Sequence, residues 1–267
     1  MATTASLLSH AEPLWLAIAP TLPGFTVEVV PVIDSTNTEL MRRARAGQNA
    51  PVLLVAEAQT AGRGRLGKGW HSRPGQSLTF SLALPLAPRD WSGLSLAVGV
   101  SLAESLHPDI RLKWPNDLWW QERKLGGILV ETASPITARG DAPRTLVVGI
   151  GLNVNRPEAA AVVAPGALPP VPPAGMAELV MGVTAGELLA QVVPGLVRDI
   201  RCFEADGFAA FAARFAARDA LHGREVVLSD GRTGVAAGVG AQGGLRVRTA
   251  DSRLHEVSSA EVSVRPC

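Results

Sequence analysis

Residues 59–70, "QTAGRGRLGKGW", combine backbone that can approach a ligand closely with side chains that attract anions. Glycines and cations alternate there without an intervening acid: Gly62, Arg63, Gly64, Arg65, Gly67, Lys68 and Gly69. Guanidinium and ammonium groups on such a loop can bind a phosphate or a carboxylate. An exposed basic turn between two strands is the competing interpretation, and we favour the anion site.

The same glycines spell G-x-G-x-x-G at residues 62–67, and Asp90 follows at roughly the spacing of the acidic residue in dinucleotide-binding folds. That fold needs a helix directly after the glycines, which Gly69, Pro74 and Gly75 prevent. Its loop also works through backbone N–H groups, whereas this loop carries formal positive charge. We therefore reject a dinucleotide site.

A second motif, "KWPNDL" at 113–118, places Lys113 beside a turn that contains Asn116 and Asp117. Turn chemistry explains proline, asparagine and aspartate at such a position, but it explains neither Lys113 nor Lys124 on the expected return strand. Two lysines brought together in a hairpin repel each other unless each has a carboxylate or an anion lies between them. Asp117 could serve one lysine, and a ligand phosphate or carboxylate could serve the other.

Glycines follow in both of the next expected strands, at Gly126-Gly127 and in "GIGLN" at 149–153. Glycine weakens a strand unless something must approach the backbone closely. A slot for a flat ligand and a bulged or strongly bent sheet are both consistent with this pattern.

Small polar residues form a third motif, "DSTN" at 34–37. The spacing from Thr36 to Glu39 is that of a capping box, and Gly47 suits the end of a helix. The same side chains could hydrogen-bond a neutral polar head group of a ligand. Both interpretations stay open on these residues alone.

Hydrophobic periodicity predicts the elements that must position these motifs. We expect strands at 25–33, 51–59, 77–86, 110–120, 124–133 and 144–155, and helices at 5–19, 34–47, 93–106 (capped by Asp90 or Ser92) and 184–219. A loop rich in proline and alanine covers 156–175. Short alternating segments with glycine turns after His222 predict a small β-barrel.

Composition narrows the class of protein. A chain of 267 residues that is 47% hydrophobic can form a large domain plus a small one. Its net charge of +1 argues against a protein that binds nucleic acid over its whole surface. Cys202 and Cys267 are the only cysteines, which favours a reducing compartment over a disulfide, and no apolar run approaches a membrane span. We therefore expect a soluble, cytoplasmic protein.

Taken together, the motifs resemble the catalytic core of biotin protein ligases, the biotin–acetyl-CoA-carboxylase ligases. The resemblance covers about residues 25–267 and rests on the order and spacing of "DSTN" at 34–37, "AEAQTAGRGRLGKGW" at 56–70, "KWPNDL" at 113–118, "KLGGILVE" at 124–131 and "GIGLNVN" at 149–155. It implies an α+β fold in which helices flank a mixed central sheet, as in class II aminoacyl-tRNA synthetases and lipoate ligases. It also implies a C-terminal SH3-like β-barrel, and we place the two domains at 1–221 and 222–267.

The activity that the resemblance implies has two half-reactions. Biotin and MgATP would give biotinyl-5′-AMP and pyrophosphate, and the acyl group would then pass to one lysine of a biotin carboxyl carrier domain. A lipoate or octanoate ligase on the same fold is the first alternative, although its pocket should be an apolar tunnel. A non-catalytic protein that binds biotin or its adenylate is the second.

The resemblance also implies roles for individual residues. Ser35, Thr36, Asn37 and Gln59 match positions at the ureido ring of biotin, with Gly127 near the ring. Arg63, Gly64 and Arg65 match the loop over the biotin tail and carboxylate. Lys124 matches the lysine that bridges carboxylate and phosphate, and Lys113 could orient the acyl phosphate or the incoming lysine. On the nucleotide side, Trp70 matches the aromatic residue that packs on adenine. Asn116 and Asp117 match the phosphate or Mg²⁺ region, with Asp117 as a metal ligand. Arg265 matches a residue that reaches the nucleotide from the barrel.

Two features depart from the family pattern. Only 33 residues precede Asp34, fewer than the roughly 60 of a DNA-binding winged helix, so we expect a monofunctional ligase without an operator. The proline- and alanine-rich segment 156–175 leaves open whether that surface makes the usual partner contacts. Family members occur as monomers or as dimers, and a homodimer is possible here.

Overall fold

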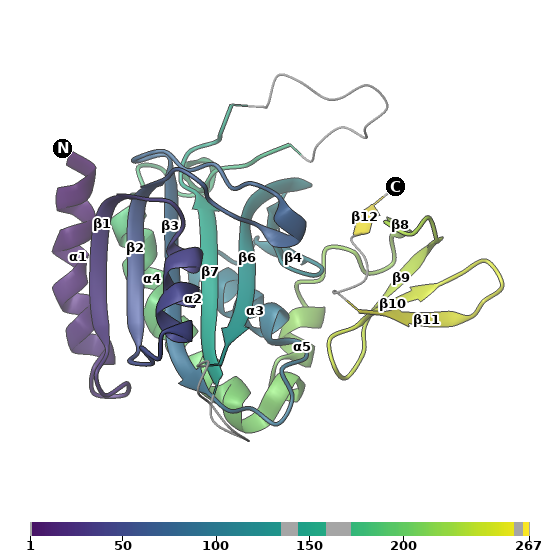
Figure 1. Cartoon of the computed structure of the whole chain (residues 1–267). Coiled ribbons are helices and arrows are strands. Elements are labelled where there is room, and N and C mark those ends of the chain that lie inside the picture. Colours follow the sequence, from purple (N-terminus) through teal and green to yellow (C-terminus); the bar gives the residue numbers. More distant parts are fainter. Residues whose placement is uncertain (1, 135–143, 159–171, 259–263, 267) are drawn as a thin grey trace.

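A mixed seven-stranded sheet forms the centre of the computed structural model, which describes residues 2–134, 144–158, 172–258 and 264–266 (Figure 1). The strand order is β1-β2-β3-β7-β6-β5-β4, and among these described strands the one parallel pair is β1 with β2. The strands are β1 (Thr26–Ile33), β2 (Val52–Gln59), β3 (Ser77–Leu86), β4 (Arg111–Lys113), β5 (Asp117–Trp120), β6 (Arg123–Ala133) and β7 (Arg144–Asn153). The expected α+β architecture is confirmed.

Helices cover both faces of this sheet, because the central strands bury side chains on both sides. On one face, α2 (Thr36–Arg45) packs Leu40 and Met41 against Leu54 and Val147. The larger core lies on the other face, where α1 (Ala2–Ile18), α3 (Leu94–Leu106) and α4 (Ala185–Asp206) pack (Figure 1). The strand ends between these layers are where the polar motifs meet.

Two helix starts differ from the sequence expectation. The N-cap of α2 is Ser35, whose side chain accepts from the Thr38 N–H, while Glu39 pairs with arginines of its own helix instead of closing a capping box. Helix α3 begins after Gly93, which has φ 80° and provides no side-chain cap. A Cβ at Gly93 would lie 2.6 Å from the Phe208 ring, so tertiary packing decides this start.

The expected helix over 184–219 is broken. After α4 the chain forms the short 3₁₀ turn η3 (Gly207–Ala210) and the five-residue helix α5 (Ala212–Ala216). Gly207 marks the break with φ 65°. The segment 110–120 forms two strands, β4 and β5, on either side of the expected turn in "KWPNDL", where the Trp114–Pro115 bond is cis.

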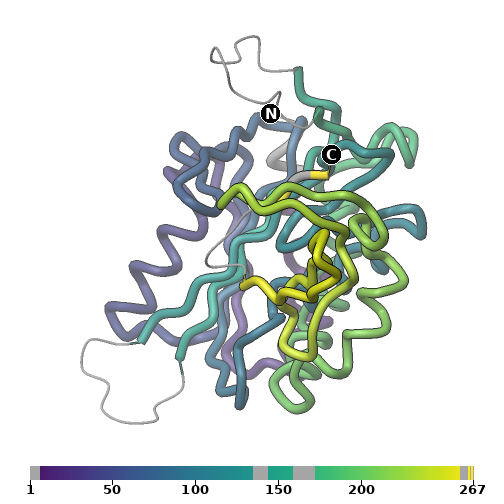
Figure 2. The backbone as a smooth tube through the Cα atoms, turned by 90° about the vertical axis from the view of Figure 1, so that its right-hand side faces the viewer, coloured from purple at the N-terminus to yellow at the C-terminus, as the bar shows by residue number. Residues whose placement is uncertain are grey.

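The C-terminal part is a separate antiparallel sheet of five strands in the order β11-β10-β9-β8-β12, which confirms the expected small β unit (Figure 2). Its strands are β8 (Glu225–Leu228), β9 (Thr233–Val239), β10 (Leu245–Arg248), β11 (Leu254–Val257) and β12 (Val264–Pro266). The Trp114 indole N–H donates to the Gly243 carbonyl at 3.0 Å and so joins the two sheets. The domain boundary after residue 221 stays a prediction, and it falls between α5 and β8.

Two further features bear on the expectations. No helix in the described ranges combines the length and apolar character of a membrane span. Cys202 is a free thiol, and Cys267 lies outside the described residues.

Candidate active site

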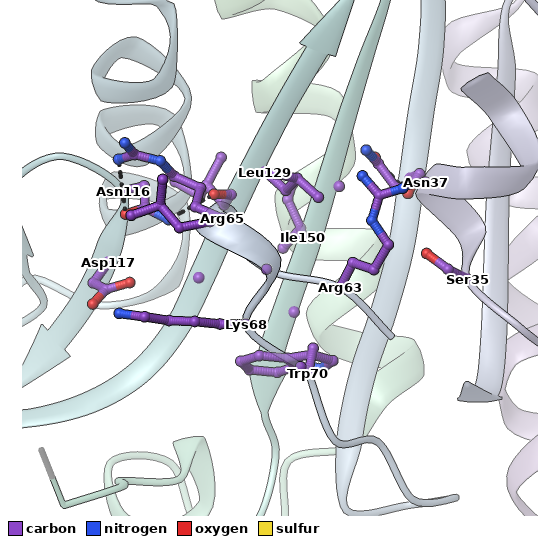
Figure 3. Close-up of a pocket in the computed structure, with 18 of the residues that line it drawn as sticks. Ser35, Asn37, Arg63, Arg65, Lys68, Trp70, Asn116, Asp117, Leu129 and Ile150 are labelled. Carbon is purple, nitrogen blue, oxygen red and sulfur yellow. Dashed lines mark hydrogen bonds between the residues drawn. The ribbon is translucent and has the colours of Figure 1, made fainter. Parts of the chain in front are cut away.

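A cavity of about 440 Å³ lies where the glycine loop crosses the ends of β5, β6 and β7 (Figure 3). This size suits a small-molecule ligand. The predicted residues at its wall are Ser35, Thr36, Asn37, Gln59, Arg63, Gly64, Arg65, Trp70, Lys113, Asn116, Asp117, Lys124 and Gly127. Gly149, Ile150 and Gly151 of the fifth motif also line the cavity, so the fold gathers residues from five separate motifs at one site.

One end of the cavity is neutral and held by hydrogen bonds among its own side chains. The Thr36 N–H donates to Gln59 Oε1 at 2.8 Å, and the Thr36 hydroxyl lies 2.8 Å from that of Ser81. The Ser81 hydroxyl in turn donates to Asn37 Oδ1 at 3.2 Å. Ser35, Thr36 and Asn37 are buried, so these bonds form a preorganised wall. Ser81 was missed from the sequence because it falls in an ordinary strand pattern without any polar motif.

The other end is charged. Lys124 Nζ donates to Asp117 Oδ1 at 2.7 Å. Arg65 Nη1 lies 3.5 Å from Asn116 Oδ1, and the Asn116 amide donates to the Ile128 carbonyl at 2.8 Å. Burial lowers the pKa of Arg65, and the charge of Asp117 opposes that shift. Among the described residues that line the cavity, Asp117 is the one carboxylate, so cations exceed anions at this end.

All three lysines of the chain line this cavity: Lys68, Lys113 and Lys124. Lys113 is buried, and its ammonium lies 5.3 Å from the centroid of the Trp119 ring. Lys68 extends from the loop toward Asp117 (Figure 3). Lys68 was expected only as one of the loop cations, without an individual role, and the rarity of lysine beside abundant arginine was a signal that could have singled it out.

The backbone of Lys124 is anchored by the end of the proline- and alanine-rich segment. The Lys124 N–H donates to the Pro172 carbonyl at 2.9 Å, and the Ala174 N–H donates to the Lys124 carbonyl at 2.8 Å. The Asn153 amide donates to the Ala174 carbonyl at 2.9 Å. Residues 172–174 therefore help to position Lys124, whereas 159–171 lie outside the described residues.

The strand glycines make room for protein groups. A Cβ at Gly151 would lie 2.3 Å from the Trp70 ring, and a Cβ at Gly149 would lie 2.6 Å from Asn37 Oδ1. The sheet also has an irregularity between Leu118 and Trp119, where β5 pairs with β6. The register shift agrees with the interpretation of a bulged sheet. The flat group on Gly151 is the indole of Trp70, so a slot for a flat ligand stays a prediction.

The loop itself forms a tight excursion between antiparallel strands. Arg63 and Gly69 pair as a β-bridge, a 3₁₀ turn covers Arg65–Gly67, and the chain then enters β3, which is antiparallel to β2. This confirms the rejection of a dinucleotide fold. Its two arginines point to different ends: Arg63 reaches toward Asn37, and Arg65 toward Asn116 (Figure 3).

Two expectations on the nucleotide side stay predictions. Val264 of β12 lines the cavity, so the C-terminal sheet reaches the site, but the Arg265 side chain lies outside what the structure describes. The described residues include no group of three or more histidine, cysteine, aspartate or glutamate side chains that could hold a metal. In this structure the oxygens of Asp117 and Asn116 face Lys124 and Arg65, and their role toward a metal stays a prediction.

Comparisons with known proteins show which sequences and structures this chain is similar to. The pattern of the biotin/lipoate A/B protein ligase family matches residues 29–153. The bifunctional ligase/repressor BirA of Escherichia coli is 34% identical over 254 residues, which cover 91% of this chain and 75% of that protein. The biotin–[acetyl-CoA-carboxylase] ligase of Paracoccus denitrificans is 31% identical over 242 residues, with coverages of 86% and 96%.

The fold is similar as well. A solved structure of the biotin protein ligase from Aquifex aeolicus in complex with biotin and ATP superimposes with a TM-score of 0.72 at 30% identity. The superposition covers 90% of this chain and 99% of that structure.

Proposed function

Because this chain belongs to the biotin/lipoate A/B protein ligase family, we propose that it is a biotin protein ligase. It activates biotin with MgATP to biotinyl-5′-AMP and pyrophosphate. It then transfers the biotinyl group to one lysine of a biotin carboxyl carrier domain in a carboxylase. The observation that carries this proposal is one cavity with a neutral hydrogen-bonding end and a cationic end.

The neutral end suits the ureido ring of biotin. Amide and hydroxyl groups of Ser35, Asn37 and Gln59 can exchange hydrogen bonds with a group that both donates and accepts. Phe80, Leu129 and Ile150 also line the cavity and offer apolar contact to the rest of biotin. An acid with an entirely apolar tail, such as octanoate, would leave the buried polar groups of the neutral end unpaired, which costs binding energy.

The cationic end suits the reacting groups. A carboxylate oxygen of biotin attacks the α-phosphorus of ATP, and the bond to pyrophosphate breaks. Two anionic groups must come together in this step, so Lys124 and Arg65 act by screening their repulsion and by stabilising charge on the transferring phosphoryl group. The reaction needs positioning more than a protein nucleophile.

Groups for the nucleotide lie beside these cations. Trp70 can stack on the adenine base, and Arg265 on β12 is proposed to approach the nucleotide from the C-terminal sheet. Magnesium normally uses one or two carboxylates plus substrate phosphates, which fits Asp117 with Asn116. When bound, the ion supplies charge neutralisation at the phosphates.

In the second half-reaction, the acceptor lysine amine attacks the acyl carbon and AMP leaves. Lys113, buried beside Trp119, is placed to orient the acyl phosphate or the incoming lysine. The glycine loop covers the cavity and excludes water, which would otherwise hydrolyse the adenylate.

Three finer points belong to the same proposal. We propose ligase activity without operator binding, and the test is whether the purified protein binds duplex DNA. A homodimer is the proposed assembly to test, by sedimentation at several concentrations. The cytoplasm is the proposed location, since Cys202 is a free thiol.

The test is pyrophosphate release from MgATP by the purified protein, with biotin, lipoate and octanoate compared in the presence of a biotin carboxyl carrier domain. Release with biotin alone, together with label on the carrier lysine, is the expected result. Release with lipoate or octanoate instead would assign the sister activity. Biotin binding without any release would leave a non-catalytic binder.

A further inference from the structure

Glu131, near the end of β6, connects the glycine loop to the neutral end of the cavity. Arg63 Nη2 donates to Glu131 Oε1 at 2.8 Å, and the Asn37 amide donates to Glu131 Oε2. Each carboxylate oxygen therefore receives one donor, from segments 68 and 94 residues away in the chain. Glu131 itself is outside the set of residues that line the cavity.

These contacts fix the orientation of the Asn37 amide. Its nitrogen faces Glu131, and its oxygen accepts from Ser81 at 3.2 Å. Gly149 provides the space, because a Cβ there would lie 2.6 Å from Asn37 Oδ1. With both ends of the amide engaged, Asn37 presents a fixed surface to the cavity.

The same carboxylate holds the loop. Besides its bond to Glu131, Arg63 donates to the Thr38 hydroxyl at 3.2 Å, so its guanidinium connects the loop to both α2 and β6. At the other end of the loop, Arg65 is 3.5 Å from Asn116, a weak contact. The charge-assisted bond from Arg63 to Glu131 is the shortest of these three contacts between the loop and the cavity rim.

We propose that Glu131 is a positioning residue of the reaction: through Arg63 it keeps the glycine loop closed over the cavity and so retains the acyl-adenylate until the acceptor lysine arrives. This inference rests on the proposed ligase function. The Arg63 and Glu131 side chains are 45% and 25% exposed, so the pair contributes little to folding. Loop opening, in contrast, responds directly to the loss of one such contact.

The test compares Glu131→Gln with the wild-type protein and with Glu122→Gln. The introduced glutamine side chain would keep an amide oxygen for Asn37 but would lose the charge that attracts Arg63. Glu122 is the matched control. Its carboxylate lies 2.6 Å from the Arg224 guanidinium, it does not line the cavity, and Glu122→Gln removes the same charge. Two quantities are measured with MgATP, biotin and carrier domain: total pyrophosphate released, and biotinyl-5′-AMP free in solution.

For Glu131→Gln we expect pyrophosphate release and the KM for biotin within about twofold of wild type, while the escaping fraction of adenylate rises about two- to fivefold, the range for one exposed ion pair. Glu122→Gln should match wild type. In an Arg63→Gln background, Glu131→Gln should not raise the escaping fraction of adenylate further, because the ion pair between the loop and Glu131 is already lost. Equal escape from both single glutamate variants, or additive effects in the double variant, would overturn the proposal.

Two outcomes separate this inference from the proposed function. A wild-type protein that releases no pyrophosphate with biotin would remove the ligase assignment and this role with it. A raised KM for biotin in Glu131→Gln without added escape would show that Glu131 supports only the wall at Asn37, and the ligase assignment would stand.

Discussion

The two ends of the cavity are stabilised in opposite ways. At the neutral end, hydroxyl and amide groups satisfy one another through Thr36, Ser81 and Asn37, with separations of 2.8 and 3.2 Å. At the charged end, three lysines and Arg65 surround Asp117, the one carboxylate among the described residues of the lining. The neutral end is therefore preorganised before a ligand binds, with donor and acceptor capacity left at its amide groups. The charged end, in contrast, has an excess of positive charge that an anionic ligand would neutralise.

This difference predicts different kinetic consequences. Groups of a preorganised wall contribute similarly to the ground state and the transition state, so their loss raises KM. Cations that act on the transferring phosphoryl group contribute most in the transition state, so their loss lowers kcat. The following variants test that division, from the largest expected effect to the smallest.

Lys124→Ala should have the largest effect. It removes the cation at the acyl phosphate, and the loss of one preorganised electrostatic group costs about 10²- to 10³-fold in kcat. Asp117 loses its partner in this variant, but the pair is partly exposed and the protein should still fold. Pyrophosphate release and circular dichroism measure the two quantities, and near-normal release from a folded variant would contradict the role of Lys124.

Gly151→Ala should act on the nucleotide. The added methyl group would lie 2.3 Å from the Trp70 ring, so the indole must move away from β7. If Trp70 stacks on adenine, the KM for ATP rises about tenfold or more, in line with about 1–3 kcal/mol for a base stacked on an aromatic side chain. The KM for biotin serves as the internal control and should change less. A larger change for biotin than for ATP would place Trp70 elsewhere.

Thr36→Val should act on the neutral end. It removes the hydroxyl that contacts Ser81 at 2.8 Å and Gln59 at 3.2 Å, while the backbone N–H bond to Gln59 remains. The loss of about 1 kcal/mol per neutral hydrogen bond predicts a KM for biotin raised about fivefold, with kcat little changed. Steady-state kinetics decide the matter, and a kcat effect as large as that of Lys124→Ala would remove the distinction between the two ends.

Asp219→Asn is a reference substitution outside the cavity. It should have the smallest effect on activity. Burial raises the pKa of Asp219, although hydrogen bonds and the charge of His222 oppose the shift. The folded protein therefore holds this proton above the unfolded pKa of about 3.9, and the associated stability is lost as pH rises through the folded pKa.

Urea unfolding of wild type and Asp219→Asn over that pH range measures this loss. Wild type should lose stability relative to the asparagine variant as pH increases, while pyrophosphate release at neutral pH stays equal in the two proteins. The opposite slope would mean that the carboxylate is stabilised in the folded state.

The sequence predicted much of this molecule because local physics decides it. The strand over 77–86 was expected from its apolar pattern, and β3 has the same bounds. The glycine loop and Lys113, Asn116 and Asp117 were expected at one site because their motifs together carry the family resemblance, and they line one cavity. The family and the two-part architecture followed from the order and spacing of the motifs.

Other features were decided only by the tertiary structure, because they depend on residues that are distant in the chain. Glu131 meets Arg63 and Asn37 across three elements, and no local pattern indicates such a pair. Gly93 starts α3 because Phe208 occupies the space of a side chain. The motifs and the resemblance they carry therefore predicted which residues line the cavity, whereas long-range packing decided which of them hold one another in place.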